Sequence, residues 1–538
     1  MKTYWYKEAV FYQIYPRSFC DGDGDGVGDI RGIISKLDYL KDLGINAVWL
    51  SPVYKSPNDD NGYDISDYRD IMDEFGVFAD WQELADGLHA RGIKLIMDLV
   101  VNHTSDEHEW FKESRKSKDN PFRDYYIWRD GTGADKKSPP NGWRACFGGS
   151  AWEYDEGTGQ FYLHLFSKKQ PDLNWDNPAV RREVADICNF WLEKGADGFR
   201  CDVITYIAKN FREDGYASDN YTIAENWQKY IRELRARSWD NYDVMIVGEC
   251  CGADAGNAHT IHGDGSGLLD TVISFDHLPW LRRYNLAAWK ATVSAWQTIG
   301  DDCWWSLYFE NHDQQRSVSR FVRPGFEKEG AEMLGTVLMF LRGTPYVYQG
   351  QELGMTNIAL TEDEFKDIQS VNMLRDAKSK LARRRAYKHL SLRARDHART
   401  PMQWNGGKNA GFSSGTPWMK VNPNYTRVNV ETQSQDPDSV LNYYKKLIVA
   451  RKSVTEIVKD GKYKEHFHGS RKYYCFTRET PDASLLVVAS FSGRSAKFTP
   501  PAGFAGAEGR LLISNNSDAD QKLSPFVLKP YEVRVYLI

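Results

Sequence analysis

The sequence predicts an α/β protein built around a (β/α)8 TIM barrel. Short apolar runs of β type alternate with longer amphipathic stretches through most of the 538 residues, and repeated βα units imply a parallel sheet. Eight such units are enough to close a barrel. Polar residues able to do chemistry stand at the carboxyl ends of the runs, as in barrel enzymes. Their position argues against the structural rival, a doubly wound open sheet.

The expected barrel elements can be followed along the chain. The strands are predicted at Phe11–Phe19, Ala47–Leu50, Leu95–Val101, Gly198–Val203, Val244–Glu249, Val272–Phe275, Trp304–Phe309 and Pro345–Tyr348. Between them, apolar residues recur with helical spacing. These helical patterns span Ile33–Leu43, Trp81–Ala90, Ala179–Lys194 and Thr222–Arg237.

Two parts of the chain depart from the barrel pattern. Residues 104–170 are rich in Gly, Asp, Lys and aromatics and show little periodicity, which predicts a small domain inserted after the third strand. From residue 462 the runs YYCFTRE, SLLVVASF, GRLLISN and EVRVYLI alternate with turn-prone residues. They predict a C-terminal antiparallel β-sandwich over 462–538. The barrel then comprises residues 1–103 and 171–461.

Composition narrows the class of protein. The chain has 69 basic and 74 acidic residues and a formal net charge of −5, which argues against nucleic acid as a partner. It has no apolar stretch near the ~20 residues that span a bilayer and no signal-peptide h-region at its start. The eight cysteines follow no disulfide framework. We expect a reduced, cytoplasmic monomer without membrane contact.

Three carboxylates close three of the predicted strands. Asp202 follows GFRC, Glu249 ends IVGE, and Asp313 ends FENHD. A single surface carboxylate is usually a solvated charge, but burying several without partners costs several kcal/mol, so three at one mouth indicate a function. Paired carboxylates around a pocket suit glycoside hydrolysis, in which one attacks the anomeric carbon and another protonates the leaving oxygen.

Seven separated motifs resemble those of the α-amylase superfamily of glycoside hydrolases. In order they are YQIYPRSF, SPNDDNGYDISDY, DLVVNH, GFRCDV, VGE, NHD and RDHARTPMQW. They are most similar to the branch that holds oligo-1,6-glucosidases (isomaltases) and the trehalulose and isomaltulose synthases. The resemblance covers essentially the whole chain, including the inserted segment and the terminal β-domain.

The resemblance implies a role for each carboxylate. Asp202 matches the nucleophile that forms a covalent glucosyl-enzyme, and Glu249 matches the general acid/base. Asp313 matches the carboxylate that binds sugar hydroxyls and supports the oxocarbenium-like transition state. Arg200 lies two residues before Asp202, on the same side of a strand, where its guanidinium is expected to keep the nucleophile ionised.

The resemblance also implies a pocket for one terminal glucose and hence an exo-acting enzyme. In this family pattern, an Asp–Arg pair that binds a sugar hydroxyl closes the inner end of the pocket. The matching substrate-binding residues are Asp60, Tyr63, His103, Phe147, Phe166, Arg200, His312 and Arg395. For Phe147 and Phe166, packing in the core of the inserted domain is an equally good interpretation of the sequence.

Two positions bear on the linkage that is cleaved. Val203 follows the nucleophile, where α-1,6-acting relatives tend to carry Val and α-1,4-acting relatives Thr. Gln170 begins QPDLN, which resembles the segment of α-1,6-specific members. A hydroxyl beside the aglycone is worth only ~1–3 kcal/mol of discrimination. The sequence favours short α-1,6-linked gluco-oligosaccharides of the isomaltose type.

Other activities of the same superfamily stay open at this stage. The segment GECCGADAGNAHTIHG after the acid is unlike that of isomaltases, and Arg282 and Arg283 partly match a loop of sucrose isomerases. They could also meet a phosphorylated sugar, as in trehalose-6-phosphate hydrolases, or simply begin an exposed helix. An α-1,4-active glucosidase and a catalytically inactive relative are further alternatives, but the latter lacks parts of the carboxylate set.

The loop DGDGDGVGD predicts a structural cation. Carboxylates alternate with glycines at Asp21, Asp23, Asp25 and Asp29, and the Val27 carbonyl would supply a further oxygen. Four crowded carboxylates repel one another without a cation, and such oxygen ligands suit Ca²⁺ first and Mg²⁺ second. Position 12 of the loop is Gly32, so it is not an EF-hand. The sequence implies no organic cofactor.

Overall fold

Eight parallel strands form the centre of the computed structural model, which describes residues 3–211, 223, 226–262, 267–278, 285–507 and 509–538. Their order in the sheet is β11-β10-β9-β5-β2-β1-β13-β12, and a parallel bridge between Val272 and Trp305 joins its two ends. The predicted TIM barrel is therefore confirmed. The strands are β1 Phe11–Ile14, β2 Ala47–Leu50, β5 Lys94–Leu99, β9 Gly198–Cys201, β10 Met245–Glu249, β11 Thr271–Ile273, β12 Ser306–Leu307 and β13 Thr344–Tyr348.

Alternate residues of these strands face two separate cores. Phe11, Trp49 and Ile96 belong to a small cluster inside the barrel, whereas Tyr12 and Val48 pack in the larger cluster between the strands and the helices. Because side chains alternate with a period of two, strands such as β1 and β2 carry apolar residues on both faces. Near the carboxyl ends the inward positions change from apolar to charged side chains.

The first predicted strand is shorter than its sequence pattern, and the first predicted helix is divided in two. The first strand ends at Ile14, and Pro16–Ser18 forms a 3-10 turn, because proline has no N–H for a sheet hydrogen bond. The helix predicted over Ile33–Leu43 is wrong as a single element: α1 Ile30–Ile34 and α2 Leu37–Leu43 are separated at Ser35, whose hydroxyl donates to the Gly32 carbonyl.

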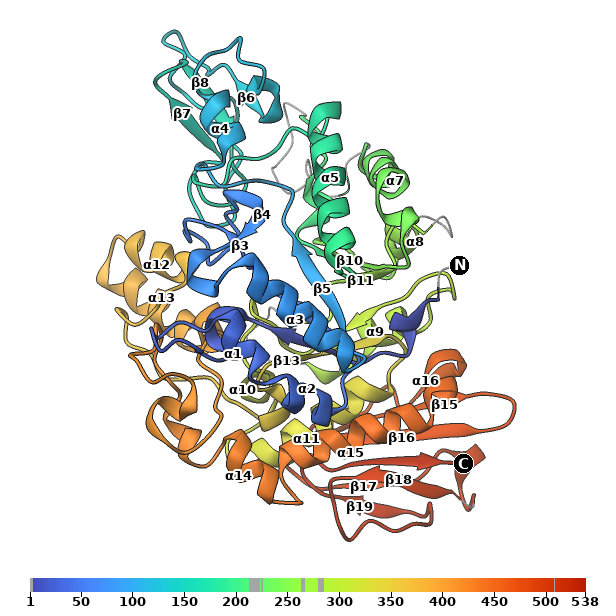
Figure 1. Ribbon diagram of the computed structural model, residues 1–538. Coiled ribbons are helices and arrows are strands. Elements are labelled where there is room, and N and C mark those ends of the chain that lie inside the picture. The colour runs from blue at the N-terminus through green and yellow to red at the C-terminus, as the bar shows by residue number, and fades with distance from the viewer. Residues whose placement is uncertain (1–2, 212–222, 224–225, 263–266, 279–284, 508) are drawn as a thin grey trace.

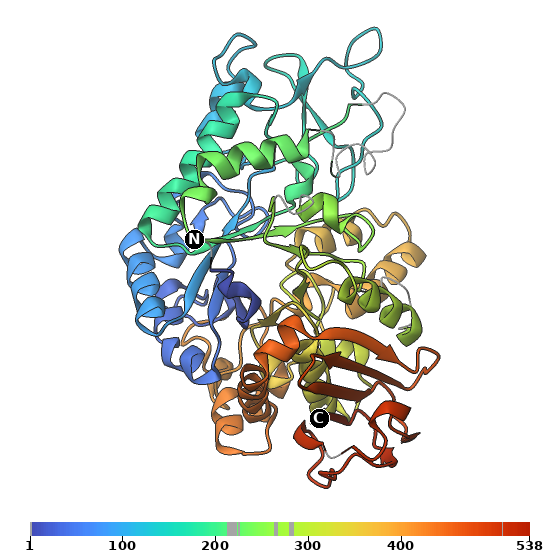
Figure 2. The ribbon, with the colours of Figure 1, turned by 90° about the vertical axis from the view of Figure 1, so that its right-hand side faces the viewer.

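The remaining helices surround the barrel (Figure 2). Of the helix predicted from Thr222, the described part is α7, which begins at Trp227. One helix, α11, is buried almost all round from Gly330 to its end, as expected for a helix between two layers. The helices are α3 Phe78–Ala90, α5 Pro178–Lys194, α7 Trp227–Arg237, α8 Ala258–His262, α9 Leu286–Gln297, α10 Ser317–Phe321, α11 Glu327–Phe340, α12 Ile368–Arg375, α13 Lys380–Arg393, α14 Val430–Gln435, α15 Val440–Ser453 and α16 Thr455–Asp460.

Between β5 and α5 the chain forms a small separate layer, which projects from one end of the barrel (Figure 1). Its antiparallel sheet has the order β6-β8-β7, with strands Trp128–Arg129, Gln160–Leu163 and Trp152–Asp155, and helix α4 Glu109–Ser114 packs beside it. Near the barrel, strands β3 Tyr54–Lys55 and β4 Asp67–Ile71 form a further hairpin. The insert therefore lies over the strand ends that carry the charged residues.

The C-terminal region forms antiparallel sheets at the opposite end of the molecule (Figures 1 and 2). A five-stranded sheet has the order β14-β15-β16-β20-β18, and β17 pairs with β19. Leu486 and Val488 of the larger sheet pack against Phe498 and Leu528 of the smaller one, which makes a sandwich. The strands are β14 Lys462–His466, β15 Tyr473–Glu479, β16 Ser484–Ser490, β17 Ala496–Phe498, β18 Arg510–Ser514, β19 Phe526–Leu528 and β20 Val533–Leu537. Across the described ranges, no helix has the length and apolarity to span a bilayer.

Candidate active site

A pocket opens at the carboxyl ends of the barrel strands, under the inserted layer. Its volume is about 190 Å³, below the several hundred Å³ of a typical drug-sized site. Most of its lining residues are those singled out in the sequence, joined by Cys146, Tyr206 and Cys251. The lining comprises Asp60, Tyr63, His103, Cys146, Phe147, Phe166, Asp202, Val203, Tyr206, Glu249, Cys251, Asp313 and Arg395.

The buried guanidinium of Arg200 organises the floor of the pocket. Its Nη1 donates to Asp98 Oδ1 at 2.9 Å and to Asp202 Oδ1 at 2.6 Å. Its Nη2 donates to Glu249 Oε2. Arg200 sits on β9, one strand away from both Asp98 on β5 and Glu249 on β10. A single positive charge therefore faces three carboxylates in a site almost without solvent.

Burial dominates the protonation of this group. It raises the pKa of Glu249 to about 7; Arg200 opposes the rise, and the charges of Asp202 and Asp313 add to it. Burial also raises the pKa of Asp202 to about 7, against the pull of Arg200. Arg200 acts in the direction expected from the sequence, because it favours the ionised form of Asp202, but burial is the larger effect.

The backbone N–H of Val203 positions the carboxyl group of Glu249. Its N–H donates to Glu249 Oε2 at 3.1 Å, while its φ of 34° and ψ of 41° lie in the left-handed region. A β-branched residue there is strained by roughly 1–3 kcal/mol, and such strain clusters at functional sites. The conformation turns the chain sharply after β9, so that one residue both lines the pocket and positions Glu249.

Asp313 is held ionised by its neighbours. Although burial acts to raise it, His312, Arg395 and Arg399 keep the pKa of Asp313 well below its usual value. Arg395 Nη1 and Arg399 Nη2 contact its Oδ1 at 3.0 and 2.9 Å. Gln13 Nε2 donates to His312 Nδ1 at 2.8 Å, so the imidazole Nε2 carries the proton that faces Asp313 Oδ2 at 3.0 Å.

Asp60 and Arg395 form one wall of the pocket. Arg395 Nη2 lies 3.6 Å from Asp60 Oδ1, and Gln170 Nε2 donates to Asp60 Oδ2 at 3.1 Å. Burial raises the pKa of Asp60 to about 7, although Arg395 opposes the rise. Gln170 also donates to the Tyr63 carbonyl at 3.3 Å, as does His103 Nε2 at 3.0 Å. Hydrogen bonds from His103 of the barrel and from Gln170 at the end of the insert thus hold this wall in place.

Aromatic rings complete the lining. Phe147 and Phe166 pack edge to face with centroids 5.6 Å apart, and the Arg395 guanidinium lies 5.1 Å from the centre of the Phe147 ring. Tyr63 stacks on His312 at 5.3 Å. Both phenylalanines are only half-buried, so their faces meet the cavity and do not only fill the core of the insert.

Sequence reasoning missed several residues that hold this site together. Asp367 contacts Arg395 Nη2 at 2.6 Å and Arg399 Nη1 at 3.0 Å. Asp98 appeared only as part of a motif, and Gln13 was not singled out. Arg399 lies within RDHARTPMQW and its motif could have indicated it, whereas Asp367 has no local signal. The Arg282 and Arg283 considered above lie outside the described residues.

The aspartate loop before α1 brings part of the predicted cation set together. Oxygens of Asp21, Asp23 and Asp29 lie within 4.8 Å of one another, and Asp25 is not in this group. Asp29 Oδ2 also accepts from the Gly22 N–H at 2.8 Å, and its Oδ1 caps α1 through Gly32 N–H at 2.6 Å. Three carboxylates at such spacing fit a hard divalent cation, and the part of Asp25 in the expected set stays a prediction.

Comparison with known proteins decides the family. The alpha amylase catalytic-domain model matches residues 13–461. The chain belongs to the α-amylase family. It is 49% identical to an oligo-1,6-glucosidase of Parageobacillus thermoglucosidasius, with all of both chains covered.

Solved structures extend the likeness to the whole fold. A trehalose-6-phosphate hydrolase of Bacillus licheniformis matches with a TM-score of 0.94 and 43% identity over 99% of each chain. A trehalulose synthase matches with a TM-score of 0.95 and 40% identity over 99% of this chain and 100% of the other. The protein is therefore an α-amylase family glycoside hydrolase.

Proposed function

We propose that the protein is a retaining, exo-acting α-glucosidase that releases glucose from the non-reducing end of short α-1,6-linked gluco-oligosaccharides. One observation carries the proposal: a pocket of about 190 Å³, sized for a single sugar, places Asp202, Glu249 and Asp313 along its wall. The Asp60–Arg395 pair at 3.6 Å supports a pocket with a closed end. An oligosaccharide can then enter the pocket only with its terminal sugar.

The raised pKa of Glu249 supports a double displacement. In the first step Asp202 attacks the anomeric carbon while Glu249 gives its proton to the leaving oxygen. In the second step Glu249 takes a proton from water, which attacks the covalent glucosyl-enzyme and releases Asp202. Burial raises the pKa of Glu249 to about 7, which favours the proton that it must donate, whereas Arg200 favours the ionised form of Asp202 that attacks.

Asp313 takes the role of a permanent anion. Its contacts with His312, Arg395 and Arg399 keep it charged, so it can accept hydrogen bonds from the hydroxyls of the bound glucose. A fixed negative charge also favours the positive charge that develops on the sugar ring in the transition state. His103 and Tyr63 supply polar atoms at the same wall.

Two features support α-1,6 specificity. Val203 presents methyl groups and no hydroxyl to the pocket, and Gln170 braces Asp60 from the insert. The relative with 49% identity over the whole chain carries the name oligo-1,6-glucosidase. The other two relatives carry the names trehalose-6-phosphate hydrolase and trehalulose synthase. Trehalose 6-phosphate hydrolysis and sucrose isomerisation are therefore the alternative outcomes of the test.

We also propose that the loop of residues 21–29 binds a structural Ca²⁺, with Mg²⁺ as the second choice. Asp21, Asp23 and Asp29 would supply carboxylate oxygens, and none of them lines the glucose pocket. All eight cysteines lie in the described part of the chain and none is in a disulfide. This supports a reducing compartment, the cytoplasm, where a monomer would meet small imported sugars.

The deciding experiment is a product analysis with isomaltose, maltose, sucrose and trehalose 6-phosphate as separate substrates. We expect rapid release of glucose from isomaltose, little from maltose, and first-formed glucose of the α configuration by NMR. Conversion of sucrose into an isomer with little free glucose would replace the proposal by an isomerase. Preferential cleavage of trehalose 6-phosphate would replace it by a phosphosugar hydrolase.

The nucleophile has its own test. Asp202→Asn should lower kcat on isomaltose by a factor of about 10⁴ or more, because the covalent route is lost. Asp186→Asn, at an exposed position of α5, is the matched control and should keep wild-type activity. Near-normal turnover in Asp202→Asn would show that another group attacks the sugar.

A further inference from the structure

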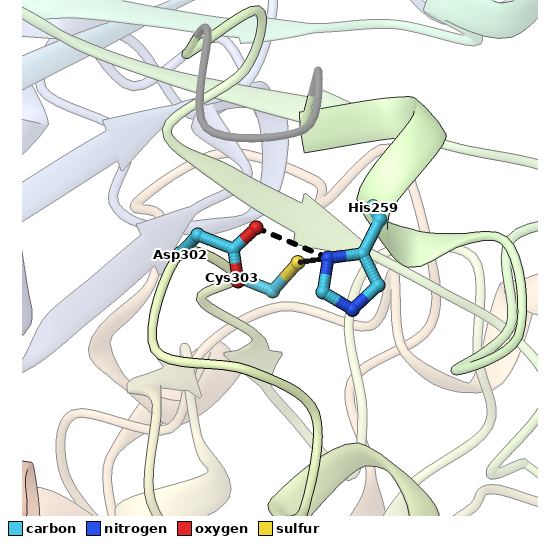
Figure 3. Close-up of side chains that lie close together, drawn as sticks. All are labelled: His259, Asp302 and Cys303. Atoms are coloured by element: carbon cyan, nitrogen blue, oxygen red, sulfur yellow. Dashed lines mark hydrogen bonds and ion pairs between the residues drawn. The ribbon is translucent and has the colours of Figure 1, made fainter.

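A second group of metal-ligating side chains lies between α8 and the segment that leads into β12 (Figure 3). His259 Nδ1 is 3.0 Å from Asp302 Oδ2 and 3.5 Å from Cys303 Sγ. One ligand atom from each residue lies within 4.8 Å of the other two. None of the three residues lines the glucose pocket, so the group is separate from the active site.

The arrangement does not suit nucleophilic catalysis. In a Cys–His–Asp relay the thiol and the carboxylate must meet different nitrogens of the imidazole, so that one accepts a proton while the other holds the ring. Here the Cys303 thiol and the Asp302 carboxylate both approach Nδ1 of His259, as Figure 3 shows. Because Nδ1 has either one lone pair or one hydrogen, it cannot accept a proton from the thiol and donate one to the carboxylate at the same time. Three potential ligand atoms within 4.8 Å of one another are instead compatible with a metal site.

One of the two printed distances matches a tetrahedral ion, and the other is shorter than such an ion requires. With metal bonds of about 2.0–2.1 Å to nitrogen and about 2.3 Å to sulfur, the two donors of a tetrahedral zinc site are about 3.6 Å apart. The observed Nδ1–Sγ distance is 3.5 Å. For nitrogen and a carboxylate oxygen the same geometry requires about 3.4 Å, and the observed distance is 3.0 Å. Binding would therefore require the His259 nitrogen and the Asp302 oxygen to move apart by about 0.4 Å.

Packing sets these ligands in place while leaving one side open. Cys303 is fully buried, whereas the side chains of His259 and Asp302 are 45% and 35% exposed. A Cβ at Gly300 would lie 2.5 Å from Asp302 Oδ1 and 3.2 Å from His259 Cε1. A side chain at residue 300 would therefore displace the Asp302 carboxylate from its present position. The exposed side gives an ion a path in and leaves a coordination position for water.

We propose that His259, Asp302 and Cys303 bind a zinc-like divalent transition metal, with water as the fourth ligand. A nitrogen, an oxygen and a sulfur donor suit Zn²⁺ and exclude the hard ions Ca²⁺ and Mg²⁺, which take oxygen ligands. The ion ties α8, which follows the strand of Glu249, to the entry of β12. Its function is to clamp α8 to the connection between α9 and β12, not to take part in glycoside cleavage.

The test uses the full-length enzyme, stripped of metal and returned to excess Ca²⁺ so that the aspartate loop is saturated. Titration with Co²⁺ should produce the near-ultraviolet absorption of a cobalt thiolate with one equivalent of metal. Cys303→Ser should abolish this band, whereas Cys475→Ser, at a buried cysteine of the C-terminal sandwich, should keep it. Absence of the band in the wild type, or its persistence in Cys303→Ser, would overturn the proposal.

Variants at the exposed ligands avoid any loss of folding in Cys303→Ser. His259→Ala and Asp302→Asn should each weaken Zn²⁺ binding at least tenfold by calorimetry and remove the Zn²⁺-dependent rise in Tm. His389→Ala and Asp301→Asn change an exposed histidine and an exposed carboxylate outside the cluster and should bind Zn²⁺ like the wild type. Isomaltose hydrolysis should persist in all four. Wild-type affinity in His259→Ala and Asp302→Asn would also overturn the proposal.

Discussion

Replacing the general acid should make the enzyme inactive but more stable. Glu249 is 6% exposed, and burial raises its pKa from 4.5 to about 7. A raised carboxyl pKa means that the folded protein disfavours the ionised form, so stability falls as pH rises from about 4.5 through about 7. At about 1.4 kcal/mol per pKa unit, the ionised side chain costs about 3 kcal/mol of unfolding free energy above pH 7.

Glu249→Gln removes this cost because glutamine has nearly the shape of the protonated acid and never ionises. The variant should therefore gain about 3 kcal/mol at pH 8 and less than about 1 kcal/mol at pH 5, where the folded protein already holds the proton. The Arg200 guanidinium keeps Asp98 and Asp202 as partners, so it is not left without a counter-ion.

Urea unfolding followed by circular dichroism at pH 5 and pH 8 measures the effect. Glu193→Gln, at an exposed position of α5, is the control and should change stability by less than about 0.5 kcal/mol at either pH. If Glu249→Gln is no more stable than the wild type at pH 8, or gains equally at both values, burial is not what raises the pKa. Activity toward isomaltose should be lost in either case.

Three further predictions follow from the geometry. Asp367→Asn should raise KM for isomaltose and lower the unfolding free energy by about 3 kcal/mol or more, because Arg395 and Arg399 lose a buried counter-ion; unchanged kinetics and stability would contradict this. Val203→Thr should lower the ratio of kcat/KM on isomaltose to that on maltose about tenfold, and an unchanged ratio would remove Val203 from specificity. Chelation should lower Tm, and Ca²⁺ should restore it more fully than Mg²⁺, through the loop of residues 21–29; a Tm insensitive to both would exclude the cation.

Sequence alone was sufficient for the fold class and for the residues that stand at strand ends. Eight apolar runs separated by helical patterns have few alternatives to a barrel. Because a barrel strand exposes its carboxyl end at one mouth, Asp202, Glu249 and Asp313 could be assigned to one site without coordinates. Proline at residue 16 and the break at Ser35 show the limit of periodicity: local hydrogen bonding ends an element where the apolar pattern continues.

Only the tertiary structure decided which charges meet. Asp367 is remote in sequence from Asp313, yet both contact Arg395 and Arg399, and no local pattern encodes such a pairing. The sequence reasoning placed Arg200 beside Asp202, but the burial that raises the pKa of that carboxyl depends on the packing of the whole mouth. His259 and Cys303 likewise carry no motif. Their proximity arises because adjacent strands of a closed barrel bring loops together regardless of separation along the chain.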